Sequence, residues 1–310
     1  MTPPVGAAAV GEAASGSTVP GAAVLGIDVG GTTVKARLVS GDDSVLAEWR
    51  EPTPRDDSTG ERTVALVAAM AHRAVREHAI RAVGLVIPGI VDETSGTSVA
   101  AVNLGWRDLP VRDLAASAVG LPLAFGHDVR AGALAESVSG AAAGTAGTVV
   151  FVPVGTGLAA ATIVDGVPLV SGGWAGEIGQ VVIPSGPHAG QRVEQIASAG
   201  AIARRLGLEN ALSAASLVRA GDAAASAVWQ EAVDTLADSL VWIAATVAPA
   251  VIVIGGGLAE AGALFFEPLE AAIDARIGII RRPLVVPAHH GDAAAVIGAT
   301  LLARAIGRGA

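Results

Sequence analysis

Residues 24–38 read Val-Leu-Gly-Ile-Asp-Val-Gly-Gly-Thr-Thr-Val-Lys-Ala-Arg-Leu. An apolar run carries a carboxylate to a Gly-Gly-Thr-Thr turn, and a second β-branched run follows at once. Two apolar runs joined by a short glycine turn predict a β-hairpin. Alternation in residues 44–50 predicts a third strand, so we expect a three-stranded meander at this end of the chain.

The turn of this hairpin carries groups that suit a phosphate. Gly30 and Gly31 have no side chain to block an anion, and their backbone N–H groups are expected to point outward as donors. The hydroxyl groups of Thr32 and Thr33 add further donors. The alternative is an ordinary tight hairpin turn, in which Gly-Gly pairs are common.

Two charged residues flank the turn. Asp28 lies at a strand end, where a carboxylate is well placed to hold a hydrated Mg²⁺ ion. Lys35 is a candidate for neutralising phosphate charge, although a lysine on a strand is more often simply solvated. Neither a Walker loop nor a Gly-x-Gly-x-x-Gly turn before a helix is present, so those two nucleotide motifs are excluded.

The composition limits the class of protein. With 310 residues, 52% of them hydrophobic, the chain has enough material for two medium domains or one large one. No apolar run reaches the roughly 18 residues of a membrane span, so no membrane partner is expected. The net charge of −9 and the lack of Lys/Arg blocks argue against a nucleic-acid partner, and the absence of cysteine excludes disulfides.

The beginning of the chain differs from the rest. Residues 1–22 are rich in Ala, Gly and Ser, and they lack the basic start and the apolar stretch of a secretory signal. We expect a disordered tail on a cytoplasmic protein.

Two buried strands deliver polar groups to their ends. Residues 82–87 form a continuous apolar run that ends in the Pro-Gly-Ile-Val-Asp loop 88–92, where α/β sheets place ligands. Residues 121–128 predict a strand that ends at Asp128, at the start of a helix over 129–137. Asp128 is either the cap of this helix or a rigidly held general base.

A second strand, glycine turn and strand follows further along. Residues 148–154 meet the turn Gly155-Thr156-Gly157, and residues 158–164 return as a strand. Two such hairpins would clamp one phosphate chain from opposite sides. Helical spacing of apolar residues predicts further helices over 61–80, 111–119, 224–248 and 293–305.

Three more segments carry candidate ligand groups. The glycine-rich stretch 170–180 reads as a ligand loop with one carboxylate, Glu177. Glu194 begins a helical region and is either a ligand or an ordinary acid at a helix start. A buried strand over 251–254 ends in a turn that lets the backbone approach a base or ribose closely; its residues are Gly255, Gly256, Gly257 and Leu258.

The motifs, taken in order, resemble those of the ROK family of sugar kinases and repressors. They are LGIDVGGTTVK (25–35), PGIVD (88–92), NLGW (103–106), HDVRAGALAE (127–136), VGTGL (154–158), GEIGQ (176–180), VIGGGL (253–258) and GDAAAVIGA (291–299). The resemblance implies the α/β, two-domain, actin-like ATPase (ribonuclease H-like) fold with an interdomain cleft. Residues 23–127 with helix 292–310 would form the small domain, and 128–291 the large one.

The resemblance also implies a function and roles for matching residues. It implies ATP-dependent phosphorylation of a hexose at its 6-hydroxyl group, with ATP and Mg²⁺ held by the two hairpin turns and adenosine near 255–258. Asp128 matches the catalytic base. The residues that match sugar-binding positions are Gly89, Asn103, Asp128, Glu177 and Glu194.

The chain departs from the family pattern at two places near the sugar. Many members have a zinc site made from a His at the end of the GEIGH motif and a Cys-rich loop; here Gln180 replaces the His and loop 185–191 has no Cys, so no zinc is expected. His127 stands where an Asn is usual. Both changes leave the identity of the sugar open.

Alternatives therefore remain beside glucose phosphorylation by ATP. One is a regulatory protein that binds a sugar without turnover. Another is a kinase that acts on an N-acetylated amino sugar or uses polyphosphate as its donor. The resemblance further implies a homodimer or homotetramer.

Overall fold

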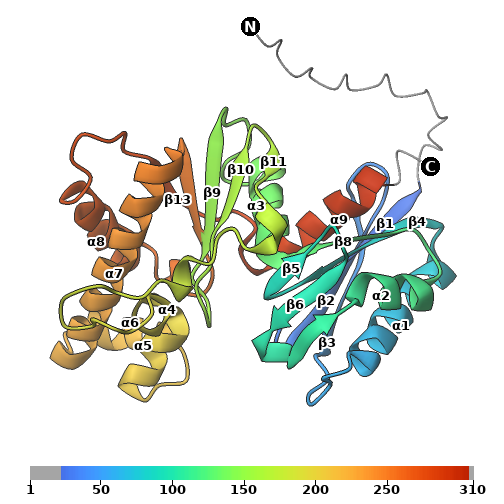
Figure 1. The fold of residues 1–310 in the computed structure, drawn as a ribbon, viewed down its shortest axis with the longest axis horizontal. Coiled ribbons are helices and arrows are strands. Elements are labelled where there is room, and N and C mark those ends of the chain that lie inside the picture. The colour runs from blue at the N-terminus through green and yellow to red at the C-terminus, as the bar shows by residue number, and fades with distance from the viewer. Residues whose placement is uncertain (1–21, 307–310) are drawn as a thin grey trace, which may run out of the picture.

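The computed structural model describes residues 22–306. This part of the chain contains two five-stranded sheets, one three-stranded sheet and nine α-helices (Figure 1). The predicted tail 1–22 lies outside the described residues except for Ala22, and so does the end of the predicted helix 292–310. The predicted α/β class is confirmed.

The first sheet contains the opening hairpin. Its strand order is β3-β2-β1-β4-β8, formed by β1 (Ala23–Val29), β2 (Thr33–Val39), β3 (Val45–Pro52), β4 (Ile80–Ile87) and β8 (Leu123–His127). Strands β1, β2 and β3 pair antiparallel, which confirms the predicted meander, and β4 and β8 continue the sheet in parallel with β1.

The second sheet repeats this topology. Its order is β11-β10-β9-β12-β13, formed by β9 (Thr148–Pro153), β10 (Ala161–Val164), β11 (Val167–Pro168), β12 (Val251–Gly255) and β13 (Leu284–Pro287). Strands β9 and β10 pair antiparallel, and β12 and β13 are parallel to β9. The second hairpin therefore occupies the position in its sheet that the first hairpin occupies in its own.

Two helices lie between the sheets. Helix α9 (Ala294–Ile306) packs on the first sheet, and α3 (Asp128–Ser139) packs on the second, and the two helices contact each other (Figure 1). A Cβ atom on Gly298 would lie 2.0 Å from the carbonyl oxygen of Ala131, so the helices approach backbone to backbone. This contact joins the two halves of the molecule.

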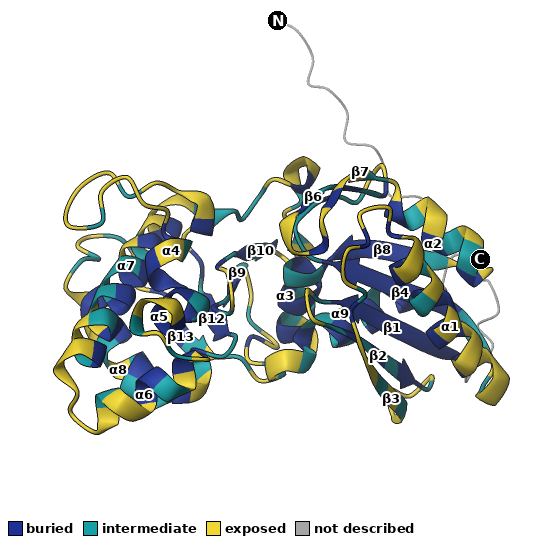
Figure 2. Cartoon of the chain, turned by 90° about the horizontal axis from the view of Figure 1, so that it is seen from below, coloured by how far each residue is buried: buried dark blue, intermediate teal, exposed yellow. Residues whose placement is uncertain are grey.

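The remaining helices cover the outer faces. Helices α1 (Glu61–Glu77) and α2 (Val111–Val119) pack on the first sheet, with their inward faces buried (Figure 2). The second sheet is covered by α4 (Glu194–Ala197), α5 (Ala199–Leu206), α6 (Ala211–Arg219), α7 (Ala223–Val247) and α8 (Ala263–Asp274). Trp229 of α7 and Phe265 of α8 meet edge to face in this core, with ring centroids 6.5 Å apart.

Several predicted boundaries were wrong. The helix predicted over 61–80 ends at Glu77, because Ile80 already begins β4. The returning strand predicted from Leu158 begins at Ala161, and Leu158 makes only an isolated bridge to Val154. Helix α6 was not predicted, because its short Ala- and Ser-rich sequence has little periodicity.

The loop predicted over 88–92 contains a strand. Residues Ile90–Asp92 form β5, which pairs with β6 (Thr97–Ala101), and β6 pairs with β7 (Trp106–Leu109). Short strands separated by turn residues give no clear alternation, so this three-stranded sheet was missed. A one-turn 3-10 helix, η1 (Val102–Leu104), joins β6 to β7 and carries Asn103.

The division into two domains at residue 128 stays a prediction. Helix α3, which begins there, packs on the second sheet and also along α9. Within residues 22–306, no helix is both long and apolar enough to cross a membrane.

Candidate active site

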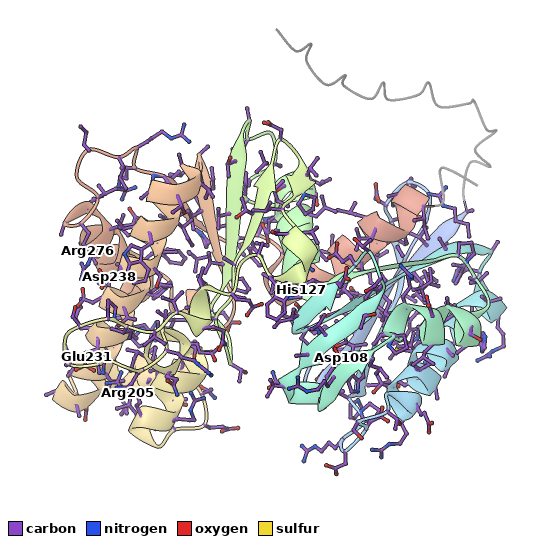
Figure 3. All side chains as sticks on the ribbon, in the orientation of Figure 1. Asp108, His127, Arg205, Glu231, Asp238 and Arg276 are labelled. Atoms are coloured by element: carbon purple, nitrogen blue, oxygen red, sulfur yellow. The ribbon has the colours of Figure 1, made fainter. Side chains whose placement is uncertain are left out.

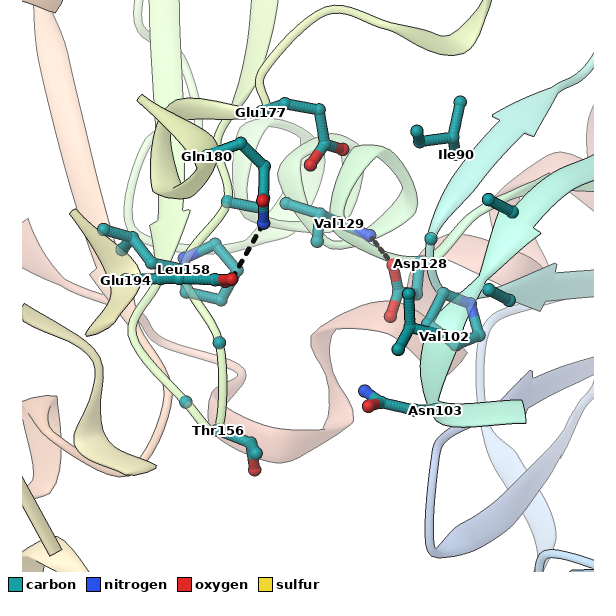
Figure 4. A pocket seen from close by; sticks show the side chains of 18 of the residues that line it. Ile90, Val102, Asn103, Asp128, Val129, Thr156, Leu158, Glu177, Gln180 and Glu194 are labelled. Carbon is teal, nitrogen blue, oxygen red and sulfur yellow. Dashed lines mark hydrogen bonds between the residues drawn. The ribbon is translucent and has the colours of Figure 1, made fainter. Parts of the chain in front are cut away.

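A cavity of about 710 Å³ opens between the two sheets, beside the junction where His127 lies (Figures 3 and 4). One wall comes from β6, η1 and the start of α3, and the other comes from the β9–β10 turn, η3 (Ile178–Gln180), α4 and α5. Eight predicted site residues line it: Gly89, Asn103, Asp128, Gly155, Thr156, Gly157, Glu177 and Glu194.

The other predicted site residues lie outside this lining. They are Asp28, Gly30, Gly31, Thr32, Thr33 and Lys35 of the first hairpin, and Gly255, Gly256, Gly257 and Leu258 after β12. The first hairpin nevertheless reaches the cavity wall, since a Cβ atom on Gly31 would lie 3.2 Å from the Cβ atom of Asn103.

Asp128 is the first residue of α3, directly after β8. Its Oδ1 accepts the backbone N–H of Val129 at 2.7 Å and lies 3.1 Å from Nε2 of His127 (Figure 4). Both contacts use the same oxygen. Among the described residues Oδ2 has no hydrogen-bond partner, so this oxygen is free to meet a ligand in the cavity.

The surroundings of Asp128 alter its acidity and that of its neighbour. Burial raises the pKa of Asp128 to about 8, and the negative charge of Asp28 adds to the rise. Burial, together with the charge of Arg130, lowers the pKa of His127 to about 3. His127 is therefore neutral near pH 7, and its Nε2 lies close to Asp128 without carrying a positive charge.

Asp28 is buried at the end of β1. Burial raises its pKa to about 6, while Lys35, whose Nζ lies 3.9 Å from the carboxylate, opposes this rise. The Lys35 Nζ donates to the backbone oxygen of Asp292 at 2.6 Å and lies 3.4 Å from the Asp292 carboxylate. Lys35 is thus held between two acids and does not line the cavity.

The glycine turns present fewer outward N–H groups than expected. The N–H of Gly30 donates to the carbonyl of Thr33 at 3.0 Å, inside its own turn, so the expectation that it points outward was wrong. In the second turn, the N–H of Gly155 donates to the carbonyl of Gly157 at 3.1 Å. The N–H groups of Gly31 and Thr156, which follow these two glycines, remain candidate donors to a phosphate.

The turn after β12 is packed against the end of β9. A Cβ atom on Gly256 would lie 2.5 Å from the carbonyl oxygen of Val154, and the N–H of Leu258 donates to that oxygen at 3.3 Å. The Leu258 side chain is 1% exposed and lies in the core. A role for this residue at a nucleotide would therefore fall to its backbone, and the role of 255–258 stays a prediction.

Two acids face Asp128 from the other wall. Glu177 precedes η3, and burial raises its pKa, with repulsion from Glu194 adding to the rise. Glu194 begins α4, and its Oε1 accepts Nε2 of Gln180 at 2.9 Å (Figure 4). A Cβ atom on Gly157 would lie 3.3 Å from Oε2 of Glu194, so the second glycine turn touches this acid.

Gly89 occupies a backbone position that only glycine fits. Its φ is +96°, and a Cβ atom there would lie 2.2 Å from the carbonyl oxygen of Ala100. The absence of a side chain lets the end of β4 pass directly beside β6, next to Asn103.

Two arginines in the lining were not predicted. Arg192 and Arg204 both reach the cavity, and neither forms an ion pair with an acid of the described chain. A Cβ atom on Gly200 would lie 3.1 Å from Nη1 of Arg204 and 2.7 Å from the carbonyl oxygen of Thr156. No pattern in the sequence distinguishes these arginines: Arg204 reaches the cavity because α5 packs on the second turn, and Arg192 reaches it from the segment just before α4.

The contacts that hold the backbone of His127 in place were also not predicted from the sequence. Glu93 accepts the backbone N–H of His127 at 3.1 Å and Nε of the buried Arg130 at 2.8 Å. Arg130 also donates to the carbonyl of Val91 at 2.9 Å. These contacts tie β5 to the start of α3 and fix the residue pair that carries Asp128.

Across residues 22–306, no group of three or more His, Cys, Asp or Glu side chains is arranged to hold a metal ion. The expectation that no zinc binds stays a prediction.

The chain is similar in sequence to several sugar kinases. It is similar to a glucokinase of Halalkalibacterium halodurans, with 30% identity over 278 residues that cover 80% of this chain and 84% of the relative. It is 31% identical over 291 residues to an N-acetylmannosamine kinase of Yersinia pseudotuberculosis, covering 90% and 97%.

Solved structures and a family model agree with this. A ROK family glucokinase from Streptomyces griseus, solved in complex with glucose and AMPPNP, has a TM-score of 0.78 and 26% identity and covers 91% of this chain and 99% of its own. The predicted fold is confirmed by this likeness. The ROK family model matches residues 24–306, so the chain belongs to the ROK family.

Proposed function

We propose that this protein is an ATP-dependent sugar kinase that phosphorylates the 6-hydroxyl group of a hexose, with Asp128 as the general base. The observation that carries the proposal is the state of Asp128. One carboxylate oxygen accepts the N–H of Val129 and lies 3.1 Å from Nε2 of His127, and the other is free in a cavity lined by further sugar-binding candidates. A rigidly held carboxylate with one free oxygen suits proton abstraction from a bound hydroxyl.

The reaction needs little from the protein beyond position and charge. As the sugar hydroxyl attacks the γ-phosphorus, its proton passes to Oδ2 of Asp128. The new bond joins the sugar oxygen to phosphorus, and the bond from phosphorus to the β-phosphate oxygen breaks, so ADP leaves. The raised pKa of Asp128 makes it a stronger base than an ordinary carboxylate.

Four polar side chains are proposed to hold the sugar. Asn103 stands beside Asp128 on one wall, and Glu177 and Glu194 stand on the other (Figure 4). Carboxylates that accept hydrogen bonds from neighbouring hydroxyl groups give orientation as well as affinity. Gln180 uses its amide donor on Glu194, which leaves the other carboxylate oxygen for the ligand.

The donor is proposed to lie across both glycine turns. The relative from Streptomyces griseus was solved with AMPPNP, which supports a nucleotide here. Asp28 fits a hydrated Mg²⁺ ion, because it is a carboxylate at a strand end whose pKa is raised by burial and which lies near a second acid, Asp128. When bound, Mg²⁺ would neutralise charge on the donor phosphates.

Two kinds of sugar are candidates for the substrate. Similarity to glucokinases favours glucose, and similarity to an N-acetylmannosamine kinase favours an N-acetylated amino sugar. These sugars differ at carbon 2, where an acetamido group needs more room than a hydroxyl.

The test is ADP release with ATP, Mg²⁺ and a panel of hexoses and N-acetylated amino sugars. We expect Asp128→Asn to lower kcat by about 10²-fold or more while the sugar still binds. Asp108→Asn is the matched control, since Asp108 is an exposed acid on β7 outside the cavity (Figure 3). A wild-type protein that binds a sugar and releases no ADP would favour the regulatory alternative or polyphosphate as the donor.

A further inference from the structure

Between Gln180 and Glu194 the chain forms a hairpin-like lobe. Val193 donates to the carbonyl of Val181 at 2.9 Å, and Ile183 donates to that of Gln191 at 2.8 Å. The base of this lobe, residues 181–193, is closed by the bond from Gln180 to Glu194. The lobe is thus connected directly to an acid of the cavity.

The tip of the lobe is attached to helix α7. Nε2 of His188 lies 3.1 Å from Oε2 of Glu231, a residue of α7. The amide of Gln191 lies 3.4 Å from Nδ1 of the same imidazole. Because the amide is a donor, Nδ1 is the acceptor, and the Nε2–H donates to the carboxylate.

The same carboxylate oxygen holds a second segment. Arg205, in the last turn of α5, donates to Oε2 of Glu231 (Figure 3). This charge-assisted bond lowers the pKa of Glu231, with the bond from His188 contributing less. Glu231 therefore fastens both ends of the segment 188–205.

That segment carries cavity groups and lies between its two attachments. Glu194 and Gln195 line the cavity within it, as do Arg192 and Arg204. We infer that Glu231 is a positioning residue for sugar binding, which acts through His188 and Arg205 to hold Glu194 against the β9–β10 turn. The inference rests on the proposed function, because Glu194 is assigned there to the sugar.

A purely structural role is the competing explanation. Val193 and Ile196 flank Glu194 and are each 1% exposed in the core, so packing by itself already restrains this part of the segment. If packing were sufficient, loss of Glu231 would lower stability without changing sugar affinity. The two explanations differ in what happens to the KM for the sugar.

The experiment compares Glu231→Ala with Asp234→Ala on the same helix. Asp234 pairs with Arg276, and the two acidic side chains are matched at 40% and 41% exposure, but Asp234 has no link to the lobe. We expect Glu231→Ala to raise the KM and the Kd for the sugar about tenfold. The kcat should stay within about twofold, and Asp234→Ala should leave kcat and both sugar constants unchanged.

Two further variants test the chain of contacts. His188→Leu removes one attachment and keeps the Arg205 bond, so it should raise the KM for the sugar and provides a test if Glu231→Ala does not fold. Glu231→Gln keeps an acceptor for both partners and should restore most of the affinity. An unchanged sugar Kd in a folded Glu231→Ala or His188→Leu variant would overturn the inference.

Calorimetric binding of the sugar separates this inference from the proposed function. A wild-type protein that phosphorylates a sugar, beside a Glu231→Ala variant with wild-type sugar Kd, would refute only the positioning role. A wild-type protein that binds none of the sugars would refute both.

Discussion

At the residue scale, the acidity of Asp128 follows from where it is held. Burial and the neighbouring charge of Asp28 both penalise the ionised form, while the Val129 N–H favours it. The result is a pKa of about 8, roughly four units above an ordinary aspartate. An uncharged His127 lies beside it and adds no positive charge that would lower this pKa.

This acidity predicts the pH dependence of the reaction. Only the ionised carboxylate accepts a proton, and a raised pKa keeps Asp128 protonated over a wider range of pH. We therefore expect kcat/KM for the sugar to fall as pH drops below about 8, by about tenfold per unit. Steady-state rates between pH 5 and 9 test this, and a rate that stays constant over the range, as an ordinary carboxylate with a pKa of about 4 would give, would contradict it.

At the element scale, the molecule consists of one arrangement used twice. Each sheet has a hairpin beside two parallel strands, and each sheet is covered on its inner side by one helix. Helices α3 and α9 meet between the sheets, where glycine allows backbone contact. Because α3 also begins at Asp128, this contact fixes the candidate base relative to both sheets.

Gly298 tests the importance of the helix contact. Gly298→Ala gains about 1 kcal/mol of helix propensity but places a Cβ atom 2.0 Å from a backbone oxygen of α3. The clash has no flexible side chain to yield, so we expect a net loss of about 2 kcal/mol in the free energy of unfolding.

Equilibrium unfolding in urea measures this loss. Ala305→Ser, at an exposed position of the same helix, is the control and should change stability by less than about 0.5 kcal/mol. A Gly298→Ala variant more stable than the wild type would show that the helices can separate without penalty.

At the scale of the whole molecule, the negative charge of the protein disfavours binding of an anionic phosphate donor. The net charge is −9, and the cavity lining contains Asp128, Glu177 and Glu194. Within the described part of the chain, the only lysine or arginine residues in the lining are Arg192 and Arg204. The positive charge of these arginines beside Thr156 would offset the repulsion that the acidic residues exert on the donor phosphates.

Arg204 is therefore expected to contribute to donor binding. Arg204→Ala should raise the KM for ATP about five- to tenfold, because a charge-assisted bond to phosphate is lost, and leave the KM for the sugar unchanged. Arg107→Ala removes the same charge from an exposed site outside the cavity and serves as the control. Equal effects of the two variants on the KM for ATP would mean that only net charge matters.

Features that depend on neighbouring residues could be predicted from the sequence. The two hairpins, the buried strands and the placement of Asp128 at a junction between strand and helix were predicted because period-two patterns, glycine turns and strand ends are local, although the helix begins at Asp128 and not at Val129 as predicted. The resemblance to the ROK family could be found for the same reason, because each motif is a short local stretch of sequence.

Other features depend on which segments the folded chain brings together. The pairing of β5, β6 and β7 and the position of Arg204 in the cavity are set by contacts that no local pattern records. Glu231 reads in the sequence as one more acid on an exposed helix face. It becomes a candidate for positioning Glu194 because folding brings His188 and Arg205, 17 positions apart, to a single carboxylate oxygen.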